Sequence, residues 1–81
     1  MSKNKLEFVN HILEARESLN IAYEVFSAMY EEGEEEKDYN DNLLNAGEFI
    51  DKELERQGVN LEEYSQYNKL IIDGEIINRE G

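Results

Sequence analysis

Three side chains near the start of the chain have the types and spacing of a metal site. Glu7, His11 and Glu14 are separated by four and three residues, so a helix would bring them onto one face about one turn apart. A two-metal site of the kind built inside helical bundles needs a second such set, and this chain has a single His. We therefore interpret His11 as a solvated or partly packed side chain and predict no metal and no other cofactor.

The segment that begins at Asp38 resembles part of a calcium-binding loop. Asp38, Asn40 and Asn42 occupy its first, third and fifth positions. Leu43 stands where that loop requires glycine, and Phe49 stands where it requires glutamate. We interpret the segment as a loop that caps the following helix.

The chain offers few groups for catalysis. It has 81 residues and no Cys, which excludes disulfides, cysteine nucleophiles and thiolate metal sites. No glycine-rich phosphate loop and no Ser-His-Asp set can be assembled from the remaining residues. Carboxylates are abundant, but nothing in the sequence marks one of them as a tuned acid or base. The sequence therefore predicts a protein that is not an enzyme.

Negative charge is the dominant property of the sequence. It has 20 acidic residues against 8 basic ones and a formal net charge of −12. A magnitude of about 2 to 8 is ample for the solubility of a small domain, and a larger one destabilises the compact state by self-repulsion. Residues 31–41 alone carry seven acids and one base. Such a chain is repelled by nucleic acid and by anionic membranes, so we expect its partner to be a basic protein.

Apolar periodicity predicts that a long helix, from about residue 4 to residue 31, precedes the acidic run. Its apolar residues recur at alternating spacings of four and three: Phe8, Ile12, Ala15, Leu19, Ala22, Phe26 and Met29. The glutamates of this segment fall on the opposite face: Glu7, Glu14, Glu17 and Glu24, with Glu31 continuing their register. We therefore expect one side of this helix to pack in the core and the other to be acidic.

Three shorter elements are predicted after the acidic run. A second helix covers about 41–57, with Asn40 or Asp41 as its cap and Gly58 as its stop signal. Gly47 lies on its apolar side, which suggests close approach to the first helix. A capping box that begins at Asn60 opens a helical turn at about 61–67, and an Asp-Gly dipeptide centres a β-hairpin at about 69–78. The fold class is α+β, mainly α, in a single small acidic domain of residues 1–81.

The predicted hairpin places isoleucines on both of its faces. Ile71 and Ile72 are consecutive, and so are Ile76 and Ile77. Because a lone two-stranded hairpin is marginal in water, both faces need cover. A homodimer is the simplest source of that cover, and packing within the domain is the alternative.

In size, acidity, Cys-free composition and helix-helix-hairpin layout, the chain resembles the small acidic proteins with which bacteriophages take over a host. It is most similar to the DNA-mimic type, which includes the phage inhibitor of the bacterial nucleoid protein HU. The resemblance implies a homodimer whose carboxylates sit where phosphates would, on the basic arms or saddle of a dimeric DNA-binding protein. No apolar run approaches the roughly 20 residues of a membrane span, so we expect the protein to be in the cytoplasm. If the chain is phage-encoded, this would be the cytoplasm of the host bacterium.

The sequence therefore predicts an acidic binding protein that inhibits a DNA-binding protein such as HU by DNA mimicry, without contacting nucleic acid itself. Tyr39 is counted among the predicted partner-binding residues because tyrosine is enriched at interface hot spots. The structural alternative is a solvated helix face and a self-repelling loop. The functional alternative is an antitoxin-like or transcription-machinery-binding regulator that acts through apolar contacts. The predicted partner-binding residues are Glu17, Glu24, Glu31, Glu32, Glu34, Glu35, Glu36, Asp38, Tyr39 and Asp41.

Overall fold

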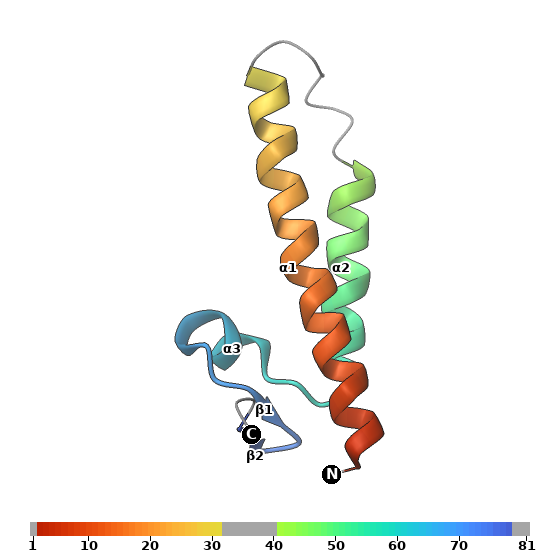
Figure 1. Ribbon diagram of the computed structural model, residues 1–81, viewed down its shortest axis with the longest axis vertical. Coiled ribbons are helices and arrows are strands. Elements are labelled where there is room, and N and C mark those ends of the chain that lie inside the picture. Colours follow the sequence, from red (N-terminus) through yellow and green to blue (C-terminus); the bar gives the residue numbers. More distant parts are fainter. Residues whose placement is uncertain (1, 32–40, 79–81) are drawn as a thin grey trace.

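The computed structural model describes residues 2–31 and 41–78. Helices α1 and α2 lie side by side and antiparallel, while α3 and a small hairpin lie together beside the N-terminal half of α1 (Figure 1). None of the helices in these two ranges is long and apolar enough to span a membrane. The predicted class, α+β and mainly α, is confirmed. The elements are α1 (Lys3–Glu31), α2 (Asp41–Arg56), α3 (Leu61–Tyr67), β1 (Ile71–Ile72) and β2 (Glu75–Ile76).

The end of α2 is fixed by Gly58. Gly58 has a φ of +89°, and its N–H donates to the Glu55 carbonyl at 2.9 Å. The next N–H, that of Val59, donates to the Leu54 carbonyl at 3.0 Å. These two bonds form a Schellman motif, in which a left-handed residue after the helix satisfies the last carbonyls. The predicted stop at Gly58 is confirmed, and Val59 is delivered directly into the core.

The segment after α2 also pairs with the hairpin. Val59 forms an antiparallel bridge with Ile72, and the Asn60 N–H donates to the Ile71 carbonyl at 3.0 Å. The side-chain Oδ1 of Asn60 accepts from the Glu63 N–H at 3.0 Å, which caps α3. Only this half of the predicted capping box forms, because the Asn60 N–H is used by the strand pairing. The hairpin therefore has a third short strand segment at its side.

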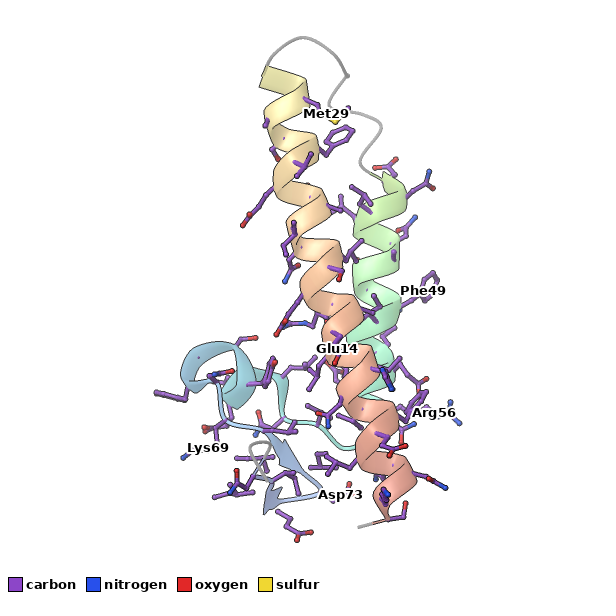
Figure 2. All side chains as sticks on the ribbon, viewed as in Figure 1. Glu14, Met29, Phe49, Arg56, Lys69 and Asp73 are labelled. Carbon is purple, nitrogen blue, oxygen red and sulfur yellow. The ribbon has the colours of Figure 1, made fainter. Side chains whose placement is uncertain are left out.

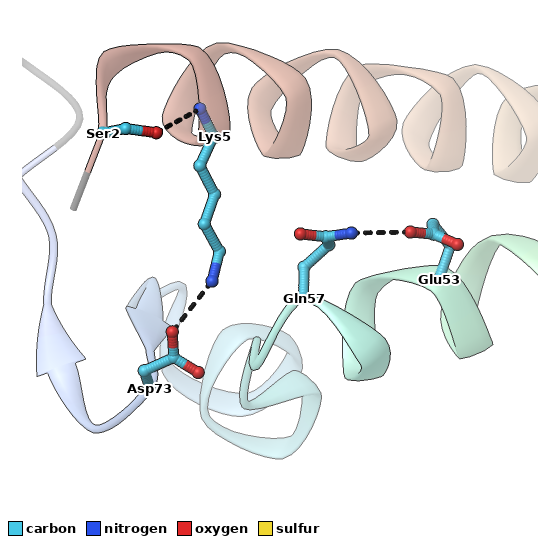
Figure 3. Close-up of polar contacts among 5 residues, drawn as sticks. All are labelled: Ser2, Lys5, Glu53, Gln57 and Asp73. Atoms are coloured by element: carbon cyan, nitrogen blue, oxygen red, sulfur yellow. Dashed lines mark hydrogen bonds and ion pairs between the residues drawn. The ribbon is translucent and has the colours of Figure 1, made fainter.

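The hairpin turns at Asp73 and Gly74, whose φ values of +52° and +80° match a type I′ turn. Its register pairs Ile71 with Ile76, and the regular strands are shorter than the predicted span of 69–78. Lys5 Nζ contacts Asp73 Oδ2 at 2.8 Å, which ties the turn to the start of α1 (Figure 3).

The core lies where α1, the end of α2, α3 and the hairpin meet. Partly buried residues pack around it, among them Ile12 of α1 and Ile50 of α2. The buried residues are Val9, Leu13, Leu54, Val59, Tyr64, Leu70 and Ile72.

The predicted core face of α1 is wrong in its N-terminal half. Phe8 is 44% exposed, whereas Val9 and Leu13 are completely buried. Val9 flanks the predicted seam and widens the apolar stripe, as expected of a helix with more than one neighbour, and this half of α1 is covered by both α2 and the α3–hairpin unit. Because α1 is covered on two adjacent sides, its most buried residues are one position further along the chain than the predicted ones.

The hairpin isoleucines are covered within the chain on one side. Ile72 is completely buried and Ile77 packs against the core, while Ile76 is 66% exposed. Packing within the domain, the alternative to a dimer, thus supplies the cover for that side. The side that carries Ile76 is left exposed by the single chain.

The rotated face of α1 predicts different losses for two neighbouring truncations. We expect Leu13→Ala to lower the free energy of unfolding by about 2–5 kcal/mol, because it opens a cavity in a fully buried site. Phe8→Ala should cost about 1 kcal/mol or less, since much of the ring is already in water. Urea unfolding followed by circular dichroism measures both, and a larger loss for Phe8→Ala would contradict the assignment.

Two glycine substitutions should change stability with opposite signs. A Cβ at Gly47 would lie 3.6 Å from Leu19 Cδ2, an ordinary contact, so Gly47→Ala should stabilise by about 0.5–1 kcal/mol through helix propensity. A Cβ at Gly58 would overlap the Asp73 carboxylate and stand 3.2 Å from the Asp73 backbone nitrogen. With the cost of a positive φ added, Gly58→Ala should destabilise by at least about 1–2 kcal/mol in the same urea assay. Destabilisation by Gly47→Ala would show that the helices are closer than described.

Candidate partner-binding surface

The α1–α2 pair has two chemically different sides. Leu19 of α1 faces Gly47 of α2, which sets the level at which the antiparallel helices meet. Arg16 Nε contacts Asp51 Oδ1 at 2.9 Å, so the flank of α1 that carries Arg16 adjoins the flank of α2 that carries Asp51. With 3.6 residues per turn, these two contacts place the other side chains. The side that contains Arg16 and Asp51, called the acidic face, carries Glu17, Glu24, Asp41, Glu48, Asp51 and Glu55.

The acidic face is built from two rows with the same repeat. On α2, Asp41, Glu48 and Glu55 follow one another at intervals of seven residues, or about 10.5 Å. On α1, Glu17 and Glu24 have the same interval. All five side chains are exposed. A seven-residue interval keeps them in line because it is close to two helical turns.

The two rows run beside each other. Because Leu19 is level with Gly47, Glu17 is level with Glu48 to within about one residue. Glu24 is level with Asp41 to the same precision. Packed helices are about 8–10 Å apart, and the rows are farther apart than the axes because Glu17 and Glu24 point away from α2. From Asp41 to Glu55 the rows place five carboxylates at three levels, about 10.5 Å apart, along about 21 Å. One strand of duplex DNA carries one phosphate per about 3.4 Å, so the rows are less dense in charge than a strand.

Arg16 holds α3 against this surface. Besides its contact with Asp51, its Nη2 donates to Ser65 Oγ at 3.3 Å. Next to it, the Tyr64 hydroxyl donates to Glu17 Oε1 at 3.3 Å. Arg16 therefore links three helices and offsets the charge of Asp51. Within the described residues, the carboxylates of Glu24, Asp41, Glu48 and Glu55 take part in no ion pair.

Two further acids have partners of their own. Glu53 accepts from Gln57 Nε2 at 2.8 Å, near the end of α2 (Figure 3). His11 Nδ1 lies 3.8 Å from Glu14 Oε2, with both side chains largely in solvent. The interpretation of His11 as a solvated side chain is confirmed. In the two ranges that the structure covers, no group of three His, Asp or Glu residues is placed to hold a metal ion.

Three of the predicted partner-binding residues come together in the fold. Glu17, Glu24 and Asp41 lie on the acidic face, and Glu31 is the last residue of α1. Glu48 and Glu55 were missed, although the interval of seven from Asp41 was readable in the sequence. The remaining predicted partner-binding residues lie outside the described ranges: Glu32, Glu34, Glu35, Glu36, Asp38 and Tyr39. Most of the segment predicted to cap the second helix lies outside them too.

Comparison with models of protein families, with curated proteins and with solved structures returned no match for this chain. The acidic face must therefore be interpreted from its own geometry and charge.

Two arginines allow the linking role of Arg16 to be tested. Arg16→Met keeps an apolar side chain but removes the contacts to α2 and α3. Arg56→Met removes only a 3.4 Å pair with Glu53, from an arginine whose side chain is 79% exposed. We expect Arg16→Met to lower the free energy of unfolding by about 1 kcal/mol more than Arg56→Met. Equal effects in urea unfolding would show that Arg16 does not hold the helices together.

Proposed function

We propose that this chain is a non-enzymatic acidic protein of the DNA-mimic type, which inhibits a bacterial DNA-binding protein such as HU by occupying its DNA-binding surface. The observation that carries the proposal is the pair of carboxylate rows on the acidic face. They gather exposed, unpaired negative charge on one side of two helices, and a DNA-binding surface is arranged to meet negative charge. A phage protein that takes over a host cell would act in this way.

The rows are suited to this role because helices hold them. Glu24, Glu48 and Glu55 project from two helices whose relative position is set by the core and by Arg16, so binding requires little ordering of the backbone. A basic partner would replace its own counterions or DNA with these carboxylates. Affinity then comes from the sum of many weak exposed contacts, each worth about 0.2–1 kcal/mol.

The acidic run of residues 31–41 belongs to the same proposal. It connects the end of α1 to the start of α2, and therefore follows Glu24 and precedes Glu48 along the chain. Besides Asp41, which already belongs to the α2 row, its six other acids would extend the charge of the two rows, and Tyr39 would add a contact with the partner.

A second candidate function is supported by exposed apolar side chains. Phe49 is 69% exposed and Ile21 is 60% exposed. An antitoxin-like or transcription-machinery-binding regulator would use such residues as its contacts. Salt separates the two functions: between about 50 and 200 mM salt, charge-mediated binding should weaken at least about tenfold, whereas apolar binding should not.

The decisive experiment compares two triple variants of equal net charge. Glu24→Gln, Glu48→Gln and Glu55→Gln neutralise the acidic face, while Glu7→Gln, Glu14→Gln and Glu75→Gln neutralise exposed acids elsewhere. Each protein is titrated into a complex of an HU-type protein with labelled duplex DNA, and displacement is followed by fluorescence anisotropy. We expect the acidic-face variant to need at least about tenfold more protein than wild type, because three contacts are lost together.

The matched control should displace DNA within about threefold of wild type, and circular dichroism should show unchanged helix content for both. Equal weakening of both variants would mean that total charge, and not the acidic face, is recognised. If wild type fails to displace DNA at any salt concentration, the proposed inhibition of an HU-type protein is wrong.

A further inference from the structure

The hairpin turn contains the one Asp-Gly sequence of the chain, formed by Asp73 and Gly74. The other three aspartates are followed by larger residues: Asp38, Asp41 and Asp51. In an Asp-Gly sequence the amide nitrogen of the glycine can attack the Cγ atom of the aspartate, because glycine has no Cβ to obstruct the approach. Asp73 is therefore the aspartate of this chain whose backbone is most open to rearrangement.

The folded chain leaves both reacting residues accessible. Asp73 and Gly74 are exposed, and the side chain of Asp73 is 66% exposed. A Cβ added at Gly74 would have no heavy atom within 4 Å, so the space beside this glycine is open. Burial therefore does not protect the turn from the reaction.

The backbone geometry of the closed turn separates the two reacting atoms. Ring closure requires the Gly74 nitrogen and the Asp73 Cβ to lie on the same side of the bond between Cα and the carbonyl carbon of Asp73. The φ values of +52° and +80° match a type I′ turn, in which the first residue has a ψ of about +30°. For an L-residue this ψ places the nitrogen and Cβ on nearly opposite sides of that bond. The reaction therefore requires the turn to open.

Two contacts hold the turn closed. The Asp73 N–H donates to the Gly58 carbonyl at 2.9 Å, which joins the turn to the end of α2. Lys5 Nζ contacts Asp73 Oδ2 at 2.8 Å, which joins the carboxylate to the start of α1 (Figure 3). Because Lys5 restrains the side chain that must move for ring closure, its removal should let the turn open more often.

The reaction consumes and releases only water. The Gly74 nitrogen forms a bond to the Asp73 Cγ, and one carboxyl oxygen leaves as water with the amide proton and a proton of the carboxyl group. The product is a five-membered cyclic imide. Water then opens this ring at either carbonyl, which restores aspartate or gives isoaspartate, whose main chain runs through Cβ and Cγ. The mass of the chain is unchanged and no oxidant or reductant is needed.

Isoaspartate does not fit this turn. The Asp73 carboxylate lies in the space that the absent Cβ of Gly58 leaves open, and isomerisation moves Cγ from that side chain into the main chain. The turn thereby gains one main-chain atom, whereas a type I′ turn fixes the strand register through two residues of ordinary length. The register pairs Ile71 with Ile76 and sets the position of Ile72, which is completely buried. The additional atom therefore weakens the hold of the hairpin on the core.

We propose that the Asp73–Gly74 bond is a site of spontaneous modification, at which Asp73 converts to isoaspartate when the turn opens and the conversion loosens the hairpin from the core. The contacts with Lys5 and Gly58 suppress the conversion in the closed turn. The modified chain is then a substrate for carboxyl methyltransferases that act on isoaspartate with S-adenosylmethionine. The inference does not rest on the proposed function, because none of these residues lies on the acidic face.

Two lysine variants provide a matched test. Lys5 contacts the turn, whereas Lys3 is exposed and takes part in no ion pair within the described ranges. Wild type, Lys5→Met and Lys3→Met are incubated at physiological temperature and neutral pH. Isoaspartate is counted with an isoaspartyl methyltransferase and labelled S-adenosylmethionine, and electron-transfer mass spectrometry of peptides locates it. We expect residue 73 to convert at least about threefold faster in Lys5→Met than in wild type, and Lys3→Met to match wild type.

The unfolded chain supplies the reference for an open turn. In guanidinium chloride above the unfolding transition, wild type should form isoaspartate at residue 73 at least about tenfold faster than the folded chain, because no opening step remains. Wild type and Lys5→Met should convert at the same rate there, since the contact that distinguishes them is absent. Chains purified with isoaspartate at residue 73 should unfold at a urea midpoint at least about 0.5 M lower than unmodified chains.

Four results would each overturn the proposal. In the first, residue 73 forms no isoaspartate even in the unfolded chain. In the second, the folded and unfolded chains convert at the same rate. In the third, Lys5→Met converts no faster than Lys3→Met, and in the fourth, the isoaspartyl chain unfolds at the same urea midpoint as the unmodified chain.

Discussion

The left-handed backbone at Gly58 is the point on which the rest of the structure depends. It stops α2 and turns the chain so that Val59 enters the core and pairs with Ile72. That pairing holds the hairpin against α1, and α3 is placed where Arg16 can reach it. A residue with a Cβ at this position would meet the Asp73 carboxylate. One glycine thus connects the helical pair to the small unit that completes its core.

The buried core is small and lies towards one end of the molecule, while six of the acids lie on the acidic face of the helical pair. Repulsion among like charges opposes the compact state of a chain with a net charge of −12. Carboxylates on the acidic face are exposed to solvent and screened by it, and only Asp51 among them is met by a described arginine. The remaining negative potential is what a basic partner would recognise in the proposed function.

Local features of the sequence determined the secondary-structure elements. The cap at Asn60, the stop at Gly58 and the turn at Asp73 and Gly74 each depend on a few neighbouring residues. Helices α1, α2 and α3 begin and end within about one residue of their predicted bounds. Only the tertiary structure decided which face of α1 is buried, because Val9 and Leu13 are covered by segments more than 40 residues away along the chain. It also decided that Glu48 lies level with Glu17 and Asp41 level with Glu24, since that depends on the level at which Gly47 meets Leu19. Periodicity specifies an apolar side of a helix, but the direction from which other elements cover it is set by contacts distant in sequence.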